Sequence, residues 1–274
     1  NLGFGSAINR GLGLAKGDYL LFLNSDLKLH SKCVGELAKV LESDSNVGGT
    51  IPKILHIDQQ NTINSLGVLI NYTGIAYPNL LGQKDPGYQE PFESACGGIF
   101  MLRREVYETV GGFDEDLFLY HEDHDLSWRI RLAGWHLKVI PQAIMYHHYK
   151  FNKGILKYYS SEKNRLHILL KNMEVKTLAL ICPALIIVEF SQWFHAAINK
   201  WFLLKMKSYF EILILLPSIL TKRKKQKYLR KVPDKEITRI YQGTLAVSGM
   251  DNSLLTNLLS PALNTYWKII RHLI

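Results

Sequence analysis

The fold is decided by residues 17–26, GDYLLFLNSD, in which a short apolar run ends abruptly in polar residues. The length of the run and its Tyr, Leu and Phe content predict a strand that is buried on both faces of a largely parallel sheet. In such sheets ligands bind beyond the carboxyl ends of the strands, where Asn24, Ser25 and Asp26 would lie. Their side-chain oxygens suit a hard divalent cation that a diphosphate also holds. The alternative is that these residues only cap a following helix, because all three types favour caps and turns.

A second informative stretch is residues 113–129, FDEDLFLYHEDHDLSWR, which places six carboxylates and two histidines among aromatic and aliphatic residues. Apolar residues at this density, such as Phe113, Tyr120 and Trp128, pull the segment against a core. Some of the carboxylates must then sit in or beside a pocket, where they need cations, metals or protons as partners. The stretch therefore indicates a site and not a solvated surface.

The chain opens with residues 1–11, NLGFGSAINRG, which predict a Gly-rich turn and then a helix over about residues 6–16. Glycines let a backbone approach a phosphate closely, and a helix N-terminus favours negative charge.

Further elements are predicted in the middle of the chain. Residues 47–52 predict a strand, and residues 63–76 predict a hairpin. Residues 79–91 contain Gly, Pro, Gln and Asp, which predict a mobile loop. Residues 154–171 have helical periodicity, and their Arg165 and His167 are candidate phosphate or acceptor contacts.

Taken in order, these motifs resemble the inverting family 2 glycosyltransferases of the GT-A fold. The resemblance rests on NLGFGSAINRGL (1–12), GDYLLFLNSD (17–26), GGIFMLRR (97–104), VGGFDE (110–115), YHEDHDLSWR (120–129) and PQAIMYHH (141–148). It is strongest to the rhamnosyltransferase-like members, which build bacterial surface polysaccharides. It implies an α/β catalytic domain over residues 1–150, with a GT-A-type, Rossmann-like mixed sheet flanked by helices.

The resemblance assigns roles to individual residues. Asn24 to Asp26 match the Asp-x-Asp element of the family, with Asn in place of the first acid. Asp26 is then the main protein ligand of Mn²⁺ or Mg²⁺, and Asn24 lies beside the donor. Asp123 matches the catalytic base, and Glu122 orients it or caps the helix. His147, or its neighbour His148, matches the histidine that completes the metal site.

Other residues near these motifs have weaker assignments. Gly97 and Gly98 would leave room for the donor sugar or the acceptor. Arg129, or Arg131, would keep Asp123 ionised beside the substrates. The alternative for Arg129 is an ion pair with Asp125, four residues earlier on a predicted helix. The remaining histidines of the stretch, His121 and His124, are expected on a loop or on the helix surface.

The implied substrates are a dTDP-, UDP- or GDP-linked sugar and a hydroxyl group of a glycan or lipid-linked acceptor. A sugar nucleotidyltransferase is disfavoured, because the chain has no Gly-rich loop with a paired Arg/Lys triphosphate site. The family also has a strand-helix-strand unit ahead of the Asn-x-Gly-Phe motif, at which this chain begins. We therefore expect a fragment of a longer product or a decayed copy, inactive by itself. The alternative function is a degenerate, membrane-associated scaffold of the same fold.

Length, composition and charge limit the possible classes of protein. The 274 residues suffice for one full domain and an extension, and three distant cysteines without metal spacing favour a reducing cytoplasmic setting. The formal net charge of +9 includes a dense basic block at residues 222–231. No zinc-finger, RNA-recognition or helix-turn-helix pattern surrounds this block, so nucleic acid is not an expected partner.

Residues 151–274 predict a helical, membrane-associating region. Residues 177–194 are about long enough to span a bilayer, although Glu189, Gln192 and Pro183 count against a span. Residues 193–207 alternate Trp with Lys as an interfacial helix does, and residues 209–220 are too short to span and are broken by Pro217. The basic block would then meet anionic head groups at the cytoplasmic face of the cell membrane. The alternative is a soluble helical subdomain.

Overall fold

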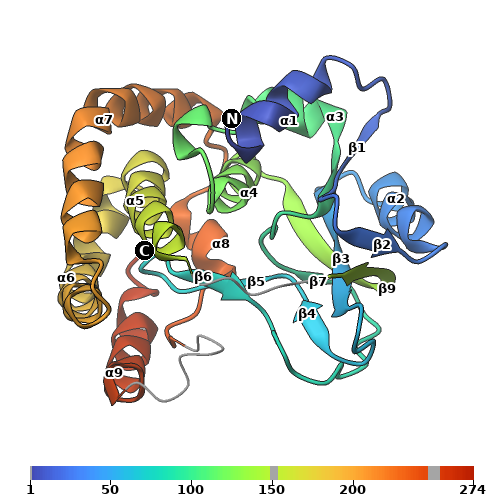
Figure 1. Ribbon diagram of the computed structural model, residues 1–274. Helices are drawn as coiled ribbons and strands as arrows, with labels where there is room; N and C mark the ends of the chain where they lie inside the picture. The colour runs from blue at the N-terminus through green and yellow to red at the C-terminus, as the bar shows by residue number, and fades with distance from the viewer. Residues whose placement is uncertain (1, 149–153, 246–253) are drawn as a thin grey trace. The chain divides into compact units, whose positions relative to one another are not determined.

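The computed structural model describes residues 2–148, 154–245 and 254–274, which form two compact units (Figure 1). The first unit comprises residues 1–69, 76–118 and 122–151. The second comprises residues 152–274 and takes in two short earlier segments, 70–75 and 119–121. The predicted domain boundary after residue 150 falls outside the described residues.

The first unit is built on a mixed sheet, which confirms the predicted α/β class. Its strands follow the order β1 (Tyr19–Phe22), β8 (Phe100–Arg103), β3 (Val47–His56), β9 (His136–His147) and β2 (Leu27–Leu29). In addition, β4 (Ile63–Ser65) pairs with β3, and β7 (Phe92–Glu93) pairs with β9. Within the described part of this sheet, the β3–β9 pair is parallel and the other pairs are antiparallel.

The prediction of a doubly buried strand in a largely parallel sheet is therefore wrong for β1. This strand pairs antiparallel with β8, with Phe22 opposite Phe100. Its buried residues Leu20 and Phe22 alternate with the half-buried Tyr19 and Leu21. The alternation was hidden in the sequence, because both faces of the strand carry apolar side chains.

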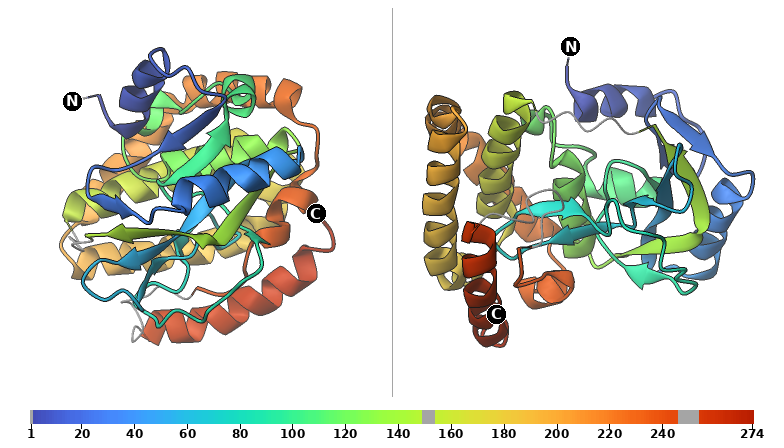
Figure 2. Two further views of the ribbon diagram at one scale, coloured as in Figure 1. Left: turned by 90° about the vertical axis from the view of Figure 1, so that its right-hand side faces the viewer. Right: turned by 60° about the horizontal axis from the view of Figure 1, so that its bottom comes forward.

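Helices cover the sheet of the first unit from both sides (Figure 1 and Figure 2). On one side α2 (Cys33–Ser43) packs Cys33, Leu37 and Leu41 against β3 and β9 in a fully buried cluster. The other helices of the unit are α1 (Phe4–Leu12), α3 (Arg104–Val110), the 3₁₀ turn η1 (Glu115–Leu117) and α4 (Glu122–Leu132). This core fixes the ends of the strands, and the candidate site lies at those ends.

The predicted hairpin is confirmed: β5 (Val68–Ile70) and β6 (Ala76–Pro78) form a separate two-stranded sheet. The loop predicted to be mobile, residues 79–91, is instead held by polar contacts. Lys53 Nζ lies 2.6 Å from Asp85 Oδ2, and Asp85 N donates to Asn61 O over 2.8 Å. Because Lys53 is buried on β3, this ion pair fixes the middle of the loop to the sheet.

The second unit is helical. It contains α5 (Ile155–Asn172), α6 (Val175–Ile198), α7 (Phe202–Leu229), α8 (Asp234–Ile237), the 3₁₀ turn η2 (Thr238–Ile240) and α9 (Leu254–Ile270). The helix break expected at Pro217 is wrong, because α7 continues through it and bends midway along its length (Figure 1). Proline removes one hydrogen bond and bends a helix, and packing against α5 keeps the two halves helical.

Side chains of this unit bind the two short segments taken from earlier in the chain. Arg165 Nη1 donates to Thr73 O over 3.0 Å, and Asn164 Nδ2 donates to Tyr120 O over 2.7 Å. Tyr72 stacks on Trp267 with ring centroids 4.7 Å apart. The expectation that Arg165 and His167 contact phosphate or acceptor is wrong, because both are buried within the unit.

Candidate functional site

One edge of the sheet collects most of the predicted site residues. The carboxyl ends of β1, β3 and β9 lie at the same edge as the start of β8, because β8 runs antiparallel to β1 and β3. Asn24 follows β1, Gly97 and Gly98 precede β8, and His147 ends β9. The strand pairing thus brings together residues that are up to about 120 positions apart in the sequence.

Asp26 and His147 are in contact at this edge. Asp26 Oδ2 lies 3.1 Å from His147 Nε2, and Asp26 O accepts from His148 N over 3.1 Å. The helix-cap alternative for residues 24–26 is wrong, because they form a turn between β1 and β2 and no helix follows directly. His148 Nδ1 lies 3.9 Å from Asp58 Oδ2 and its side chain is 52% exposed, so the structure pairs His147, not His148, with Asp26.

Asn64 holds the imidazole of His147 and was not found from the sequence. His147 Nδ1 lies 3.0 Å from Oδ1 of the buried Asn64. An amide oxygen only accepts, so Nδ1 is the donor in this contact, and Nε2 is the ring nitrogen that faces Asp26. Metal-binding histidines are oriented in this way by a partner on the other ring nitrogen. No sequence motif marks Asn64, because it lies 83 residues before His147.

The pair fits a divalent cation. Two neighbouring ligands of an octahedral Mg²⁺ at about 2.1 Å lie roughly 3.0 Å apart, close to the observed spacing of Asp26 and His147. A carboxylate and a neutral imidazole are also acceptable ligands for Mn²⁺. Among the described residues no group of three or more His, Cys, Asp or Glu side chains surrounds one point. A cation here would therefore need further ligands of other kinds, such as substrate, water or amide oxygens.

Asp123 lies at the start of α4, next to the Gly97–Gly98 turn. Its Oδ1 accepts from the backbone N–H of His124 over 2.7 Å, and the backbone N–H of Gly98 also donates to this carboxylate. Gly98 has φ +76° and no atom within 4 Å of the position of a Cβ, so its outer side is open. Gly97 is close-packed, because a Cβ there would come within 2.8 Å of Val68.

Burial shifts the pKa of both neighbouring acids upward. It raises the pKa of Asp123 to about 6, although backbone N–H groups oppose the shift. It raises the pKa of the buried Glu122 to about 8, and the negative charge of Asp123 adds to this increase. The pair therefore carries close to one negative charge at neutral pH, mainly on Asp123.

Arginine does not supply the charge support predicted for Asp123. Arg129 Nε lies 2.9 Å from Asp125 Oδ2 in a fully buried ion pair, and Arg129 Nη1 donates to Val110 O over 2.6 Å. Arg131 Nη1 pairs with Glu93 Oε2 at 3.1 Å. The ion-pair alternative for Arg129 is thus confirmed, and its burial leaves it no open face toward a donor.

One of the two histidines of this stretch differs from expectation, whereas His121 lies on the expected loop, directly before α4. The prediction of a surface position is wrong for His124, which is buried beside Trp128 in α4. His121 belongs to the second unit, where burial and then Arg165 lower its pKa to about 4.

Ser127 ties the helix of Asp123 to the glycine turn. Its buried Oγ accepts from Cys96 N over 2.8 Å and donates to Asp123 O over 2.8 Å. One hydroxyl group therefore fixes the position of α4 relative to the residue that precedes Gly97. This link was not predictable from local pattern, because a serine in the middle of a helix usually faces solvent or its own backbone.

The amino-terminal glycines allow close packing of the first helix. The helix α1 begins at Phe4, where Phe4 N donates to Phe118 O over 3.0 Å. A Cβ at Gly5 would come within 2.8 Å of Phe113. Asn9 Oδ1 accepts from Tyr107 Oη over 2.6 Å and from Phe113 N over 2.9 Å. The motif therefore fixes α1 on the loop that leads to α4.

Two family models match this chain. The model described as Glycosyl transferase family 2 matches residues 1–111, and the model described as N-terminal domain of galactosyltransferase matches residues 80–151. Both matches fall in the region that carries the sheet-edge residues.

Curated relatives and a solved structure are also similar. N-acetylglucosaminyl-diphospho-decaprenol L-rhamnosyltransferase of Mycobacterium tuberculosis is 38% identical over 66 residues, 24% of this chain and 22% of the relative. Rhamnosyltransferase WbbL of Escherichia coli is 31% identical over 144 residues, 49% of this chain and 54% of the relative. A crystal structure of GalNAc-T7 with UDP, GalNAc and Mn²⁺ has a TM-score of 0.50 at 21% identity, covering 62% of this chain and 35% of that one. The chain thus matches less than two thirds of each relative's length.

Proposed function

Because residues 1–111 match glycosyl transferase family 2 and the similar proteins include rhamnosyltransferases, we propose that this chain transfers a sugar from a nucleotide-sugar to a hydroxyl group with inversion. The donor is a dTDP-, UDP- or GDP-linked sugar, and the acceptor is a glycan or lipid-linked glycan of the cell surface. One observation carries the proposal: a carboxylate supported by backbone N–H groups, Asp123, shares a sheet edge with the Asp26–His147 pair.

Asp123 acts as the general base. Its carboxylate takes the proton of the acceptor hydroxyl while that oxygen bonds to the anomeric carbon, and the bond from this carbon to the diphosphate oxygen breaks. A pKa of about 6 leaves Asp123 mostly ionised at neutral pH and still basic enough to accept a proton. Glu122 stays mostly protonated, so it adds little negative charge beside the base. The open side of Gly98 leaves room for the reacting groups.

Asp26 and His147 would hold Mn²⁺ or Mg²⁺, with Asn24 beside them on the donor side. A bound divalent cation would neutralise the nucleoside diphosphate as it leaves. Asn64 contacts Nδ1 of His147 and so holds the imidazole with Nε2 facing Asp26, which makes Asn64 part of the same functional unit.

The reaction takes place at the cytoplasmic face of the cell membrane, and residues 151–274 attach the protein there. Two observations support attachment to a membrane. The name of the M. tuberculosis relative specifies a decaprenol-linked acceptor. Within the described residues, one helix, α6, is long and apolar enough to cross a membrane.

The test is release of nucleoside diphosphate by the full-length gene product, supplied with Mn²⁺, each class of nucleotide-sugar and a polyprenyl-diphosphate-linked acceptor. We expect turnover with one donor class and its loss on chelation. Folded protein that turns over none of the donors would contradict the enzyme and favour the scaffold alternative.

A further inference from the structure

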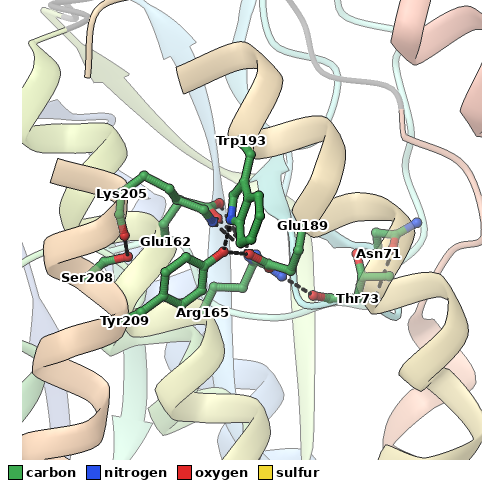
Figure 3. Close-up of polar contacts among 9 residues, drawn as sticks. All are labelled: Asn71, Thr73, Glu162, Arg165, Glu189, Trp193, Lys205, Ser208 and Tyr209. Carbon is green, nitrogen blue, oxygen red and sulfur yellow. Dashed lines mark hydrogen bonds and ion pairs between the residues drawn. The ribbon is translucent and has the colours of Figure 1, made fainter. Parts of the chain in front are cut away.

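A set of four charged side chains, of which Glu162, Arg165 and Lys205 are buried and Glu189 is half-buried, joins three helices of the second unit (Figure 3). Glu162 and Arg165 belong to α5, Glu189 to α6 and Lys205 to α7. Arg165 Nη2 donates to Glu162 Oε2 over 2.9 Å and also to Glu189. Lys205 Nζ donates to Glu162 and, over 2.8 Å, to Glu189 Oε2. Two acids and two bases give this charge cluster no net charge.

The charge cluster holds α6 against its neighbours. Burial by itself raises the pKa of Glu162, but Arg165 and Lys205 outweigh burial and lower this pKa to about 2. The pKa of Glu189 is lowered as well, because Arg165 and Lys205 outweigh both burial and the charge of Glu162. Tyr209 Oη also donates to Glu189. A buried charge that loses its partners is strongly unfavourable, so Glu189 keeps α6 attached to α5 and α7.

The charge cluster and a membrane-crossing orientation of α6 exclude each other. With 24 residues, α6 is about 36 Å long and would cover a hydrocarbon core of about 30 Å. Glu189 is the fifteenth of these residues, counted from Val175, so crossing would carry its carboxylate into the hydrocarbon. There the carboxylate would either be separated from Arg165 and Lys205 or bring both cations into the hydrocarbon, and both outcomes are unfavourable.

The face of α6 turned away from its buried side is apolar along its length. The buried side carries Ile181, Ala184 and Val188. The outward side carries large apolar side chains at helical spacing, each 38% to 62% exposed: Ile186, Ile187, Phe190, Trp193, Phe194 and Ile198. Between Lys176 and Lys200 the chain has no Asp, Glu, Lys or Arg other than Glu189.

We propose that α6 lies along the surface of an anionic lipid bilayer, with this apolar face in the boundary between head groups and acyl chains. The inference rests on the membrane attachment in the proposed function and specifies its mode. Trp193 is of the residue type that prefers this boundary. Lys176 and Lys200, both exposed, lie at the two ends of the helix, where their long side chains reach lipid phosphates.

The same lysines argue against a second copy of this chain as the covering partner. Two copies that pack along α6 bring these lysines together, either like with like or Lys176 against Lys200, and both arrangements repel. The lysines Lys224, Lys225 and Lys227 of α7 are also exposed. In contrast, Arg223 and Arg230 of the basic block donate to the carbonyls of Leu170 and Asn172. The exposed basic side chains among these residues are therefore the three lysines, and lysine is suited to diffuse attraction to an anionic surface.

Flotation of the full-length protein with vesicles of phosphatidylglycerol and phosphatidylethanolamine tests the face. We expect the double variant Phe190→Ser/Phe194→Ser to lower vesicle partitioning at least about tenfold. The matched control Leu14→Ser/Tyr88→Ser, which removes exposed apolar side chains from the first unit, should float like the wild type. Equal flotation of both variants would overturn the proposal. If the Phe variant instead turns a dimer into a monomer without changing flotation, a second copy covers the face.

Thiol labelling tests the orientation. In a Cys182→Ser background, Lys176→Cys and Lys200→Cys report the two ends of α6 in membrane vesicles from expressing cells. Cys33 and Cys96 are buried and do not interfere. We expect a membrane-impermeant maleimide to reach both ends from the same side, whereas labelling from opposite sides would show a crossing helix. Neither experiment measures turnover, and diphosphate release in detergent tests the enzyme separately, so the two proposals fail independently.

Discussion

Burial raises the pKa of the acids in two parts of this protein, but the net pKa shifts are opposite because cations surround only one of the two groups. At the sheet edge the pKa of Glu122 rises to about 8 and that of Asp123 to about 6. In the charge cluster the pKa of Glu162 falls to about 2. A carboxylate buried with Arg and Lys stays charged, whereas one supported mainly by backbone N–H groups stays near the point where it exchanges a proton. A carboxylate that stays charged is suited to holding helices together, and a carboxylate that exchanges a proton near neutral pH is suited to acid–base catalysis.

Replacing the base should have the largest effect. Asp123→Asn keeps the shape of the side chain but cannot accept a proton, so we expect turnover to fall about 10²- to 10⁴-fold without loss of fold. The measurement is nucleoside diphosphate release by the full-length protein, with circular dichroism to verify folding. Glu122→Gln is the matched control, because Glu122 is already mostly neutral at pH 7, and it should change turnover less than about tenfold. If the Asn variant stays active, Asp123 is not the base.

Removing one cation from the charge cluster should have the largest effect on stability. Lys205→Met leaves Arg165 as the one cation of the charge cluster for Glu162 and Glu189, and we expect it to lower the free energy of unfolding by about 3–5 kcal/mol. Lys207→Met is the control two residues along α7, where the lysine is 58% exposed and 3.8 Å from Glu211. That loss should be below about 1 kcal/mol. Urea denaturation measures both, and equal losses would mean that the cluster does not stabilise the unit.

The sheet-edge residues were predictable because motifs mark them, whereas their supports were not. Asp26, Asp123 and His147 each lie in a recognisable stretch of sequence. Asn64 and Ser127 do not, because their roles depend on strand pairing and helix packing between distant segments. Side chains whose partners lie far along the chain carry no local signal.

The second unit was hard to predict for a related reason. Charged residues within apolar helices look solvent-facing until their partners on other helices are known, as with Arg165 and Lys205. Trp201 was expected in an interfacial helix, but it is buried and stacks on Tyr158 at 5.5 Å. In β1, uniformly apolar side chains hid the alternation that reveals an antiparallel strand. The positions of helices and strands could be predicted from the local sequence pattern. Which face of each element is buried could not, because that depends on tertiary contacts.

The pH dependence of stability tests the raised pKa of Glu122. The folded protein holds the Glu122 proton up to about pH 8, whereas the unfolded chain releases it near 4.5. Unfolding therefore releases a proton in this range, and the contribution of Glu122 to stability falls as pH rises from about 4.5 to 8. Glu122→Gln should remove this fall, which is on the order of 3 kcal/mol. Thermal or urea unfolding at pH 5 and pH 8 measures the effect, and parallel curves for variant and wild type would contradict the raised pKa.

The smallest predicted effect concerns the orientation of His147. Asn64→Ala removes the acceptor of the Nδ1 proton, so the imidazole is free to turn, and we expect Mn²⁺ affinity to fall about 10- to 100-fold. Asn64→Asp keeps an oxygen acceptor and should restore binding, which separates orientation from a general loss of packing. Asn61→Ala, at an exposed asparagine three residues earlier, should leave affinity unchanged. Calorimetric titration with Mn²⁺ alone measures affinity without turnover. If Asn64→Ala binds Mn²⁺ as the wild type does while His147→Ala does not, the imidazole is a ligand whose orientation is fixed by other contacts.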